Sequence, residues 1–325
     1  MGNLKTWLPP KKGGTVEMKL GRLRVTIQRT GEHARSGTRL SSTQLDRLIG
    51  TWAPLPSGPD PGLLAAVSVA EIASADGHMR AKEILRDRGI VVVPRFLNRD
   101  EALAAGRRAL ALLYDLKGAY SHADPLRNYV VEVDSTRGYY DLVNDHVATI
   151  NLRRNEDYGM VDIFNFDRLD NSAGAGLRQT LSHPHLISLI PSPAGERWKP
   201  SNLNVYVNRN VSHTRMFHAD SYGDGQVKAF VYLTDVQSMG DGPYSYVVDS
   251  HTPGPYRDMN RALTKVGDIF KPTDAPLVDT SKILPVLAPA GSLVVSNQSG
   301  FHRGYPQASD HERVVAVLNI LADRD

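Results

Sequence analysis

The chain has 325 residues, of which 41% are apolar, and a formal net charge of +3. This composition is typical of a globular protein that buries a full core, and no apolar run approaches the roughly 20 residues that span a bilayer. The chain contains no cysteine, which excludes disulfides and thiolate metal sites, so any metal is expected on histidine and carboxylate side chains. The first residues lack the apolar stretch of a signal peptide, and the cytoplasm is therefore the expected location.

Positive charge is concentrated in residues 1–40, which hold nine lysines and arginines against two glutamates. The proline-rich stretch APLPSGPDPG, residues 53–62, is typical of a linker. We therefore expect residues 1–75 to form a basic N-terminal arm and linker, followed by a folded domain over residues 76–325. Basic segments can contact nucleic acid, but this one lacks interleaved aromatic residues and a reading helix, so nucleic acid is not the expected partner. The sequence leaves the oligomeric state open, a homo-oligomer included.

In chain order, the alternation of apolar and polar residues in GRLRVTIQR, residues 21–29, predicts one short strand in the arm. The apolar stretch over residues 62–75 predicts a helix. A second helix is predicted from Ala81, and a buried strand follows it at Ile90–Val93. Asn98 then has the position of an N-cap, which indicates that a long helix starts there.

Residues 118–170 are polar and aromatic with little periodicity, so we expect an irregular region that helps to cover the active face. After Lys199 the pattern changes to short apolar strands separated by Gly, Pro, Asn and Asp. Many antiparallel strands after a helical lead-in predict a mainly β fold with flanking helices, namely a double-stranded β-helix (jelly roll, cupin-like). The strands are predicted at residues 202–209, 228–236, 244–249, 291–298 and 313–321.

The tripeptide HAD that contains His218 and Asp220 lies in a segment expected to be extended. Residues i and i+2 of such a segment face the same side, so the imidazole and the carboxylate can converge on one ion. A third ligand must come from elsewhere, and His302 follows a strong predicted strand. Two histidines and one carboxylate form the facial triad suited to non-haem Fe(II), which leaves positions open for chemistry. Arg313, at the start of the last strand, could hold a small dicarboxylate nearby through its planar guanidinium.

The pattern His218-x-Asp220, His302 and Arg313, together with the stretch RGIVVVPRFLNRDE, resembles the phytanoyl-CoA dioxygenase family of Fe(II)/2-oxoglutarate oxygenases. The resemblance covers roughly residues 80–322. It implies that His218, Asp220 and His302 are the catalytic iron ligands and that Arg313 binds the distal carboxylate of 2-oxoglutarate. Looser matches imply further cosubstrate contacts at Asn204, Tyr206 and Ser221.

The resemblance also implies a reaction, with residues 76–325 as the oxygenase domain. Fe(II), 2-oxoglutarate and O2 would together hydroxylate a C–H bond of a small polar metabolite, such as a sugar, an amino acid derivative or a natural product, with release of succinate and CO2. The carboxylate of Asp220 favours hydroxylation, because related halogenases have a small residue there and bind a halide instead. Gly304 stands where family members often carry a hydroxyl residue, so one cosubstrate contact of the family is missing.

Other histidines offer rival ligand sets. A second HAD tripeptide, at His122, is followed by proline and by no strand, so we interpret it as a surface or pocket group. His251 with Arg261 mimics the distal pair, but it follows His218 too closely to leave enough strands for a roll. The remaining candidates are interpreted as caps or surface groups: His183, His185 and His311.

The sequence does not identify the substrate. Polar side chains from the region 118–170 could meet it, although ordinary loop packing is the simpler interpretation of each: Tyr139, Tyr140, Arg153, Arg154, Asn165 and Asp167. Two other functions stay open, namely a cupin-like metal enzyme that does not use 2-oxoglutarate and a non-catalytic jelly-roll module that binds glycans or a partner protein. The first has no need of Arg313, and the second predicts no Fe(II) binding.

Overall fold

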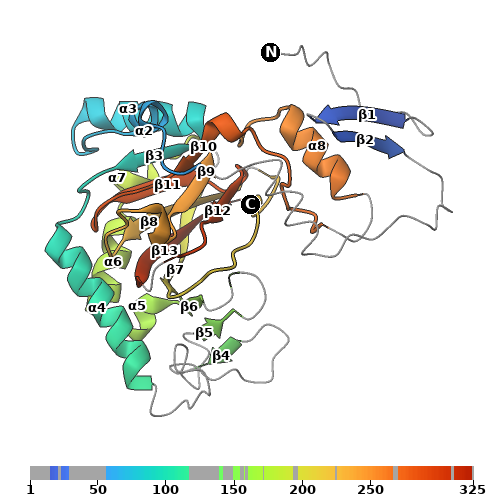
Figure 1. Cartoon of the computed structure of the whole chain (residues 1–325). Coiled ribbons are helices and arrows are strands. Elements are labelled where there is room, and N and C mark those ends of the chain that lie inside the picture. Colours follow the sequence, from blue (N-terminus) through green and yellow to red (C-terminus); the bar gives the residue numbers. More distant parts are fainter. Residues whose placement is uncertain are drawn as a thin grey trace.

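A computed structural model describes two short strands of the arm and most of the chain from residue 56 onward (Figure 1). Within this described part of the chain, no helix combines the length and the apolar character that a membrane crossing requires. The described residues are 15–20, 23–28, 56–116, 139–141, 149–153, 157, 160–170, 172–192, 197–223, 225–265, 270–308 and 311–323.

The largest element of the fold is an eight-stranded sheet in the order β3-β11-β8-β13-β7-β6-β5-β4. Every neighbouring pair in it is antiparallel. The central strands β11, β8 and β13 are almost wholly buried, which explains their apolar sequences. The strands are β3 (Ile90–Val93), β4 (Tyr139–Asp141), β5 (Thr149–Leu152), β6 (Val161–Phe164), β7 (Arg197–Asn208), β8 (Gln226–Tyr232), β11 (Leu293–Asn297) and β13 (Arg313–Asp323).

A smaller antiparallel sheet faces the large one and consists of β10 (Ile283–Pro285), β9 (Tyr244–Val247) and β12 (His302–Gly304). The two sheets touch through side chains, because the ring centroid of Tyr244 on β9 lies 4.7 Å from that of Phe230 on β8. The hydroxyl of Tyr232 also donates to the carbonyl oxygen after β10, at Val286. This antiparallel double-sheet sandwich confirms the predicted jelly-roll fold class.

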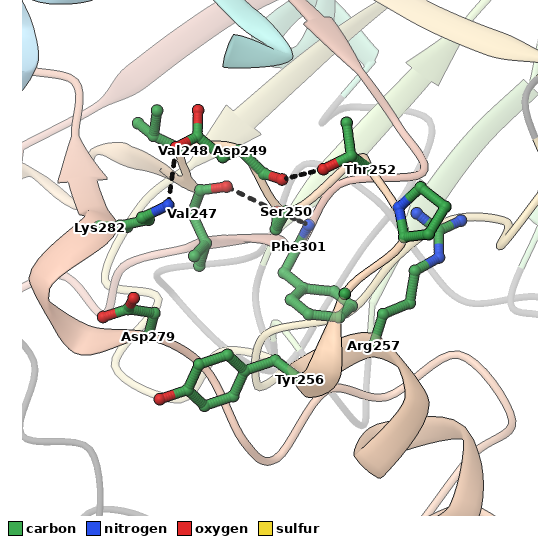
Figure 2. Close-up of a pocket in the computed structure, with 12 residues that line it drawn as sticks. Val247, Val248, Asp249, Ser250, Thr252, Tyr256, Arg257, Asp279, Lys282 and Phe301 are labelled. Carbon is green, nitrogen blue, oxygen red and sulfur yellow. Dashed lines mark hydrogen bonds and ion pairs between the residues drawn. The ribbon is translucent and has the colours of Figure 1, made fainter. Parts of the chain in front are cut away.

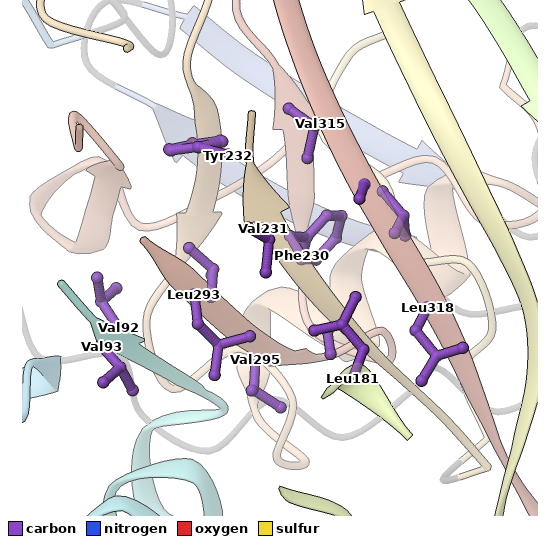
Figure 3. Close-up of a cluster of buried hydrophobic side chains, with 14 of the residues drawn as sticks. Val92, Val93, Leu181, Phe230, Val231, Tyr232, Leu293, Val295, Val315 and Leu318 are labelled. Carbon is purple, nitrogen blue, oxygen red and sulfur yellow. The ribbon is translucent and has the colours of Figure 1, made fainter. Parts of the chain in front are cut away.

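Helices cover the side of the large sheet away from the small one (Figure 1). Helix α6 contacts β13 and helix α5 contacts β7, while α2 and α3 pack near β3. Figure 3 shows the resulting apolar core, in which Leu181 of α6 lies among strand residues such as Val231 and Leu318. The helices are α2 (Pro61–Val67), α3 (Ala75–Arg88), α4 (Arg99–Leu116), α5 (Phe166–Leu169), α6 (Ala173–Leu181), α7 (Pro184–Ile187) and α8 (Pro255–Leu263).

The strands predicted from apolar patterns are confirmed, with β3 at the predicted residues and β9 and β11 within the predicted ranges. Strands β7, β8 and β13 overlap their predicted ranges but extend beyond them, β7 and β8 at the start and β13 at the end. The strand predicted in the arm is β2 (Leu23–Gln28), which pairs with β1 (Thr15–Leu20). The irregular region expected over 118–170 is wrong in part, because β4, β5 and β6 pair in series onto β7. Strands of three or four residues contain too few alternations to give a clear periodic signal.

The helix predicted over residues 62–75 is too long. Helix α2 ends at Val67, and Ser68 is extended and forms a bridge with Val92 of β3. A new helix, α3, then starts after Ser74, whose hydroxyl accepts a hydrogen bond from the Gly77 amide. Tertiary pairing with β3 therefore overrides the local helical pattern. The division of the chain at residue 75 stays a prediction, and the residues just before it, such as Val67, are buried in the main core.

The turn from α3 into β3 requires a glycine. Gly89 has a φ of +76°, in the left-handed region that residues with a Cβ rarely adopt. A Cβ at this position would also lie 2.4 Å from Nδ1 of His251 and 2.5 Å from the hydroxyl of Tyr246. This close approach fixes α3 against the segment that follows β9.

The buried centre of the large sheet yields a stability prediction. Leu293 of β11 is fully buried and is paired with Val93 on one side and Val231 on the other. Leu293→Ala should lower the free energy of unfolding by about 2–5 kcal/mol, because it removes buried apolar surface and leaves a cavity. Chemical denaturation measures this change. Leu321→Ala on β13, where the side chain is 41% exposed, is the control and should change stability by about 0.5 kcal/mol or less. Equal effects of the two substitutions would contradict the assigned core.

Candidate metal centre

The backbone places His218 and His302 side by side. The amide of His218 donates to the carbonyl of His302 at 3.1 Å, and the amide of His302 donates to the carbonyl of His218 at 2.9 Å. The segment of His218 thus extends the small sheet next to β12. The amide of Asp220 is held in turn by the carbonyl of Gln298 at 2.9 Å. Residues far apart in the sequence therefore meet through ordinary antiparallel pairing.

Three potential ligand atoms converge at this pair. Oδ1 of Asp220 lies 3.7 Å from Nε2 of His218 and 3.6 Å from Nε2 of His302. Among the described residues, these three are the group whose spacing could hold a metal ion, because each offers one potential ligand atom and these atoms lie within 4.8 Å of one another. The structure thus brings together the three residues expected from the sequence, and their role as metal ligands stays a prediction.

Hydrogen bonds to the backbone orient both imidazoles. Nδ1 of His218 lies 2.9 Å from the carbonyl oxygen of Met216, and Nδ1 of His302 lies 3.0 Å from that of Gly300. A carbonyl can only accept, so Nδ1 of each ring donates a proton to it, and Nε2 is the ring nitrogen that faces Asp220. Burial, together with His302 and Arg215, holds the pKa of His218 well below its ordinary value. Neutral imidazoles with a free Nε2 are in the state that binds a metal.

The second oxygen of the Asp220 carboxylate has a different partner. Nζ of Lys228 donates to Oδ2 of Asp220 at 2.5 Å. Burial opposes the charge of Asp220, but Lys228 and His302 outweigh it and hold the pKa of this carboxyl well below its ordinary value. Burial likewise opposes the charge of Lys228, and Asp220 outweighs it and raises the pKa of the amine. Lys228 is not among the residues expected from the sequence, although a lysine inside an apolar strand is a signal.

A cavity of about 230 Å³ adjoins these residues between the two sheets. Side chains of a strand alternate between its two faces, so residues two apart on β7, β8 and β13 line the same space. The register aligns them across the strands, because Val315 is paired with Tyr206 on one side and with Tyr232 on the other. The large sheet contributes to the lining Tyr206, Asn208, Lys228, Phe230, Tyr232, Arg313 and Val315.

Arg313 is a buried cation at this cavity, with 7% of its surface exposed. Its Nη2 donates to Oδ1 of Asn208 at 2.9 Å and its Nη1 donates to the carbonyl oxygen of Gly242. Both acceptors are neutral, and among the described residues no carboxylate forms an ion pair with this guanidinium. Burial lowers the pKa of Arg313, and Tyr232 and Asp157 offset this only in part. An anionic group in the cavity would supply the missing charge partner.

The other expected cosubstrate residues differ in position. Tyr206 lines the cavity, whereas Asn204 and Ser221 are not part of its lining. The Asn204 side chain is buried elsewhere and accepts hydrogen bonds from the Asn165 amide and from Asn202. Ser221 is exposed and accepts a hydrogen bond from the Gly223 amide. The structure therefore brings only Tyr206 of these three to the cavity.

Gly304 lies beside the guanidinium of Arg313. A Cβ built on it would meet, within 4 Å, only Nη2 of Arg313, at 3.7 Å. The position thus has room for a side chain. Because glycine has none, this space remains part of the cavity, which Gly304 lines.

The polar candidates from the region 118–170 also differ in whether they line the cavity. Arg153 lines the cavity and pairs with the carboxylates of Asp157 and Asp162, each at 2.9 Å. Asn165 and Asp167 do not line it. Four candidates lie, in whole or in their side chains, outside the described residues: His122, Tyr139, Tyr140 and Arg154.

The rival histidines that the structure describes belong neither to the group of His218, Asp220 and His302 nor to the lining of the cavity. The ring of His251 interacts with the carbonyl of Arg86 at 2.9 Å, and the ring of His311 with that of Asp235 at 2.8 Å. His183 caps helix α7, as expected from the sequence, by accepting a hydrogen bond from the backbone amide of His185.

A second cavity, of about 220 Å³, is lined by Phe301 and by residues that follow β9 (Figure 2). Figure 2 shows that Tyr256 and Phe301 contribute rings to it, while Lys282 contacts Asp249 at its edge. Among the described residues, no group of three metal-ligating side chains gathers here. Within the described part of the chain, the cavity between the two sheets is therefore the one that combines a ligand cluster with a buried cation.

The donor set fits a divalent first-row metal. It consists of two imidazole nitrogens and one carboxylate oxygen without sulfur, which suits Fe(II) and leaves coordination positions for small molecules. Lys228 and the two backbone carbonyls fix the orientation of all three side chains from behind, as outer-shell groups do in metalloproteins.

No protein-family model matches the sequence, and neither does any curated protein. Membership of the family that the sequence resembles therefore stays a prediction.

Similar solved structures include the epimerase SnoN in complex with Fe3+, alpha ketoglutarate and nogalamycin RO, with 18% identity, a TM-score of 0.47, and coverage of 76% of this chain and 84% of SnoN. HygX from Streptomyces hygroscopicus, with nickel and 2-oxoglutarate bound, has 14% identity and a TM-score of 0.44, with coverage of 74% and 85%. AviO1 from Streptomyces viridochromogenes Tue57 has 15% identity and a TM-score of 0.47, with coverage of 76% and 95%.

The geometry of the cluster predicts the effect of removing one ligand. His302→Ala should weaken binding of Co(II) by more than about 100-fold, since loss of a mere outer-shell partner already costs 10–100-fold. Anaerobic calorimetric titration measures this. His213→Ala serves as the control, because His213 is an exposed histidine in the same segment as His218. The affinity of this variant for Co(II) should equal that of the unsubstituted protein. Similar losses in both variants would argue against the cluster as the binding site.

Proposed function

We propose that the protein is an Fe(II)/2-oxoglutarate-dependent dioxygenase that hydroxylates a C–H bond of a small polar metabolite. The observation that carries this proposal is the buried guanidinium of Arg313, which lacks a carboxylate partner among the described residues and lines the same cavity as the two-histidine, one-carboxylate cluster. A metal site alone fits many enzymes. A metal site with a buried cation that awaits an anion fits a reaction with a dicarboxylate cosubstrate.

Each residue of the site has a role in this proposal. His218, Asp220 and His302 hold the iron, and Arg313 binds the distal carboxylate of 2-oxoglutarate. The bound iron would supply the oxidative decarboxylation of 2-oxoglutarate by O2, which yields succinate and CO2 and oxidises the substrate. The side chain of Asn208 orients the guanidinium by accepting from Nη2 at 2.9 Å. The protein thus contributes position and electrostatics to chemistry that belongs to the cofactor.

The walls of the cavity support the same assignment. Phe230 and Val315 are apolar and buried and would exclude water from the cosubstrate. The volume of about 230 Å³ suits a compact acid better than a long lipid chain. Charged groups also line it, among them Arg153 and Arg215, which supports a polar substrate.

The two rival functions give different results in one titration. Fe(II) and 2-oxoglutarate are added without oxygen, and the weak visible metal-to-ligand absorption band is recorded. A dioxygenase gives the band, a metal enzyme of the cupin type binds Fe(II) without it, and a non-catalytic module shows neither response. Absence of the band at millimolar 2-oxoglutarate would reject the proposal.

The role of Arg313 yields a quantitative prediction. Arg313→Gln should raise the 2-oxoglutarate concentration that half-saturates the absorption band by about 30-fold or more, because loss of one partner of a buried charged contact costs about 2–5 kcal/mol. Binding of Fe(II) should be retained. Arg107→Gln on the exposed face of α4 is the control and should behave as the unsubstituted protein. An unchanged 2-oxoglutarate dependence in Arg313→Gln would contradict the assignment.

The outcome of the reaction depends on Asp220. Asp220→Ala should abolish hydroxylation, because the iron loses its carboxylate ligand. The measurement is succinate release during a screen of polar metabolites, followed by mass analysis of the product for one added oxygen. Undiminished turnover by Asp220→Ala would refute its role as a ligand.

A further inference from the structure

Lys228 is a charged side chain between the two sheets, and neither metal binding nor cosubstrate binding has been assigned to it. It projects from β8, where Lys228 is paired on both sides, with Ser296 of β11 and with Asn319 of β13. Its Cα position is therefore fixed by the sheet. The side chain is mostly buried, with 14% of its surface exposed.

The two oxygens of the Asp220 carboxylate are not equivalent. Oδ2 receives the hydrogen bond from Nζ of Lys228 at 2.5 Å, whereas Oδ1 faces Nε2 of the two histidines at 3.7 and 3.6 Å. The contact with Lys228 is short and charge-assisted, which makes it a strong type of hydrogen bond. The amide of Asp220 is also held, by the carbonyl of Gln298. The backbone at both ends of the contact is thus held in place by hydrogen bonds of the sheets.

The different partners of Oδ1 and Oδ2 affect how Asp220 can coordinate a metal ion. A carboxylate that binds a metal through both oxygens occupies two positions, whereas one that binds through a single oxygen leaves the second position open. We propose that Lys228 is a positioning residue that restricts Asp220 to coordination through Oδ1 alone. The inference rests on the proposed metal site and adds to it a residue that sets how many coordination positions remain for cosubstrate and oxygen.

Infrared difference spectroscopy on Co(II) binding tests this role without any turnover. The separation between the two carboxylate stretching bands is wide for coordination through one oxygen and narrow for coordination through both. Labelling with [13C]aspartate, and loss of the signal in Asp220→Asn, identify the bands of this residue. The unsubstituted protein should show a wide separation, and Lys228→Met should show a narrower one.

Lys282→Met is the matched control. Lys282 forms an equivalent lysine–aspartate contact with Asp249, at 2.7 Å, beside the other cavity (Figure 2). This substitution also removes the lysine partner of an aspartate, but at a site that does not include His218, Asp220 or His302. The Asp220 bands of Lys282→Met should match those of the unsubstituted protein.

A second readout counts the open positions directly. With Mn(II) bound, the proton relaxation of water should show a loss of about one exchangeable water per ion in Lys228→Met, and no loss in Lys282→Met. Bands and water count unchanged in Lys228→Met would overturn the positioning role. An increased 2-oxoglutarate requirement with unchanged Asp220 bands would also overturn it, because Lys228 would then contact the cosubstrate instead.

The test remains decisive if Lys228→Met does not fold. A narrow band separation in the unsubstituted protein would by itself overturn the inference. No Co(II)-dependent band in the unsubstituted protein would instead reject the metal centre of the proposed function, which distinguishes failure of the site from failure of this role.

Discussion

The two-residue alternation of side chains along β7, β8 and β13 is the constraint on which the rest of the molecule depends. On β8, Val227 and Val231 lie on the opposite face from Lys228 and Tyr232, which line the cavity. A slip of one residue would turn the charged side chain into the apolar packing beneath the helices and the valines toward the cavity. The apolar face therefore sets the register, and the register in turn aligns Arg313 and Asn208 across two strands. Packing far from the chemistry thus decides which side chains can take part in it.

Two cations that line the cavity, Lys228 and Arg313, are compensated in different ways. Lys228 contacts the carboxylate of Asp220, whereas Arg313 contacts only neutral oxygens from Asn208 and Gly242 among the described residues. A buried charge without an ionic partner is unfavourable for stability, so such a group in a cavity indicates a binding requirement more than a folding one. Arg313 and the two histidines line the same cavity, and under the proposed function one small acid would contact both.

Much of the fold and the centre of the site could be predicted from the sequence, because both depend on strand alternation and on spacing along the chain. What could not be predicted depends on tertiary detail. Helix α2 ends at Val67 because Ser68 pairs with a strand that lies later in the sequence. Asn204 is on the same face as Tyr206, yet one pleat further along, where the side chain is satisfied by other amides. Ser221 follows Asp220 directly, and adjacent residues of an extended segment face opposite sides. The alternation of side chains along an extended segment would therefore have excluded Ser221. For Asn204, by contrast, only the sheet register shows that the residue lies beyond the cavity.

The reciprocal backbone hydrogen bonds between His218 and His302 also bear on how the protein matures. These bonds belong to the sheet itself, and the negative charge of Asp220 is balanced by a lysine of the same chain. The convergence of His218, Asp220 and His302 is thus supported by contacts within the polypeptide. Under the proposed function, an arriving metal ion would meet ligands whose backbone positions the sheet already sets, so the peptide hydrogen bonds of the sheet would limit how far the two imidazoles can spread to suit a larger ion.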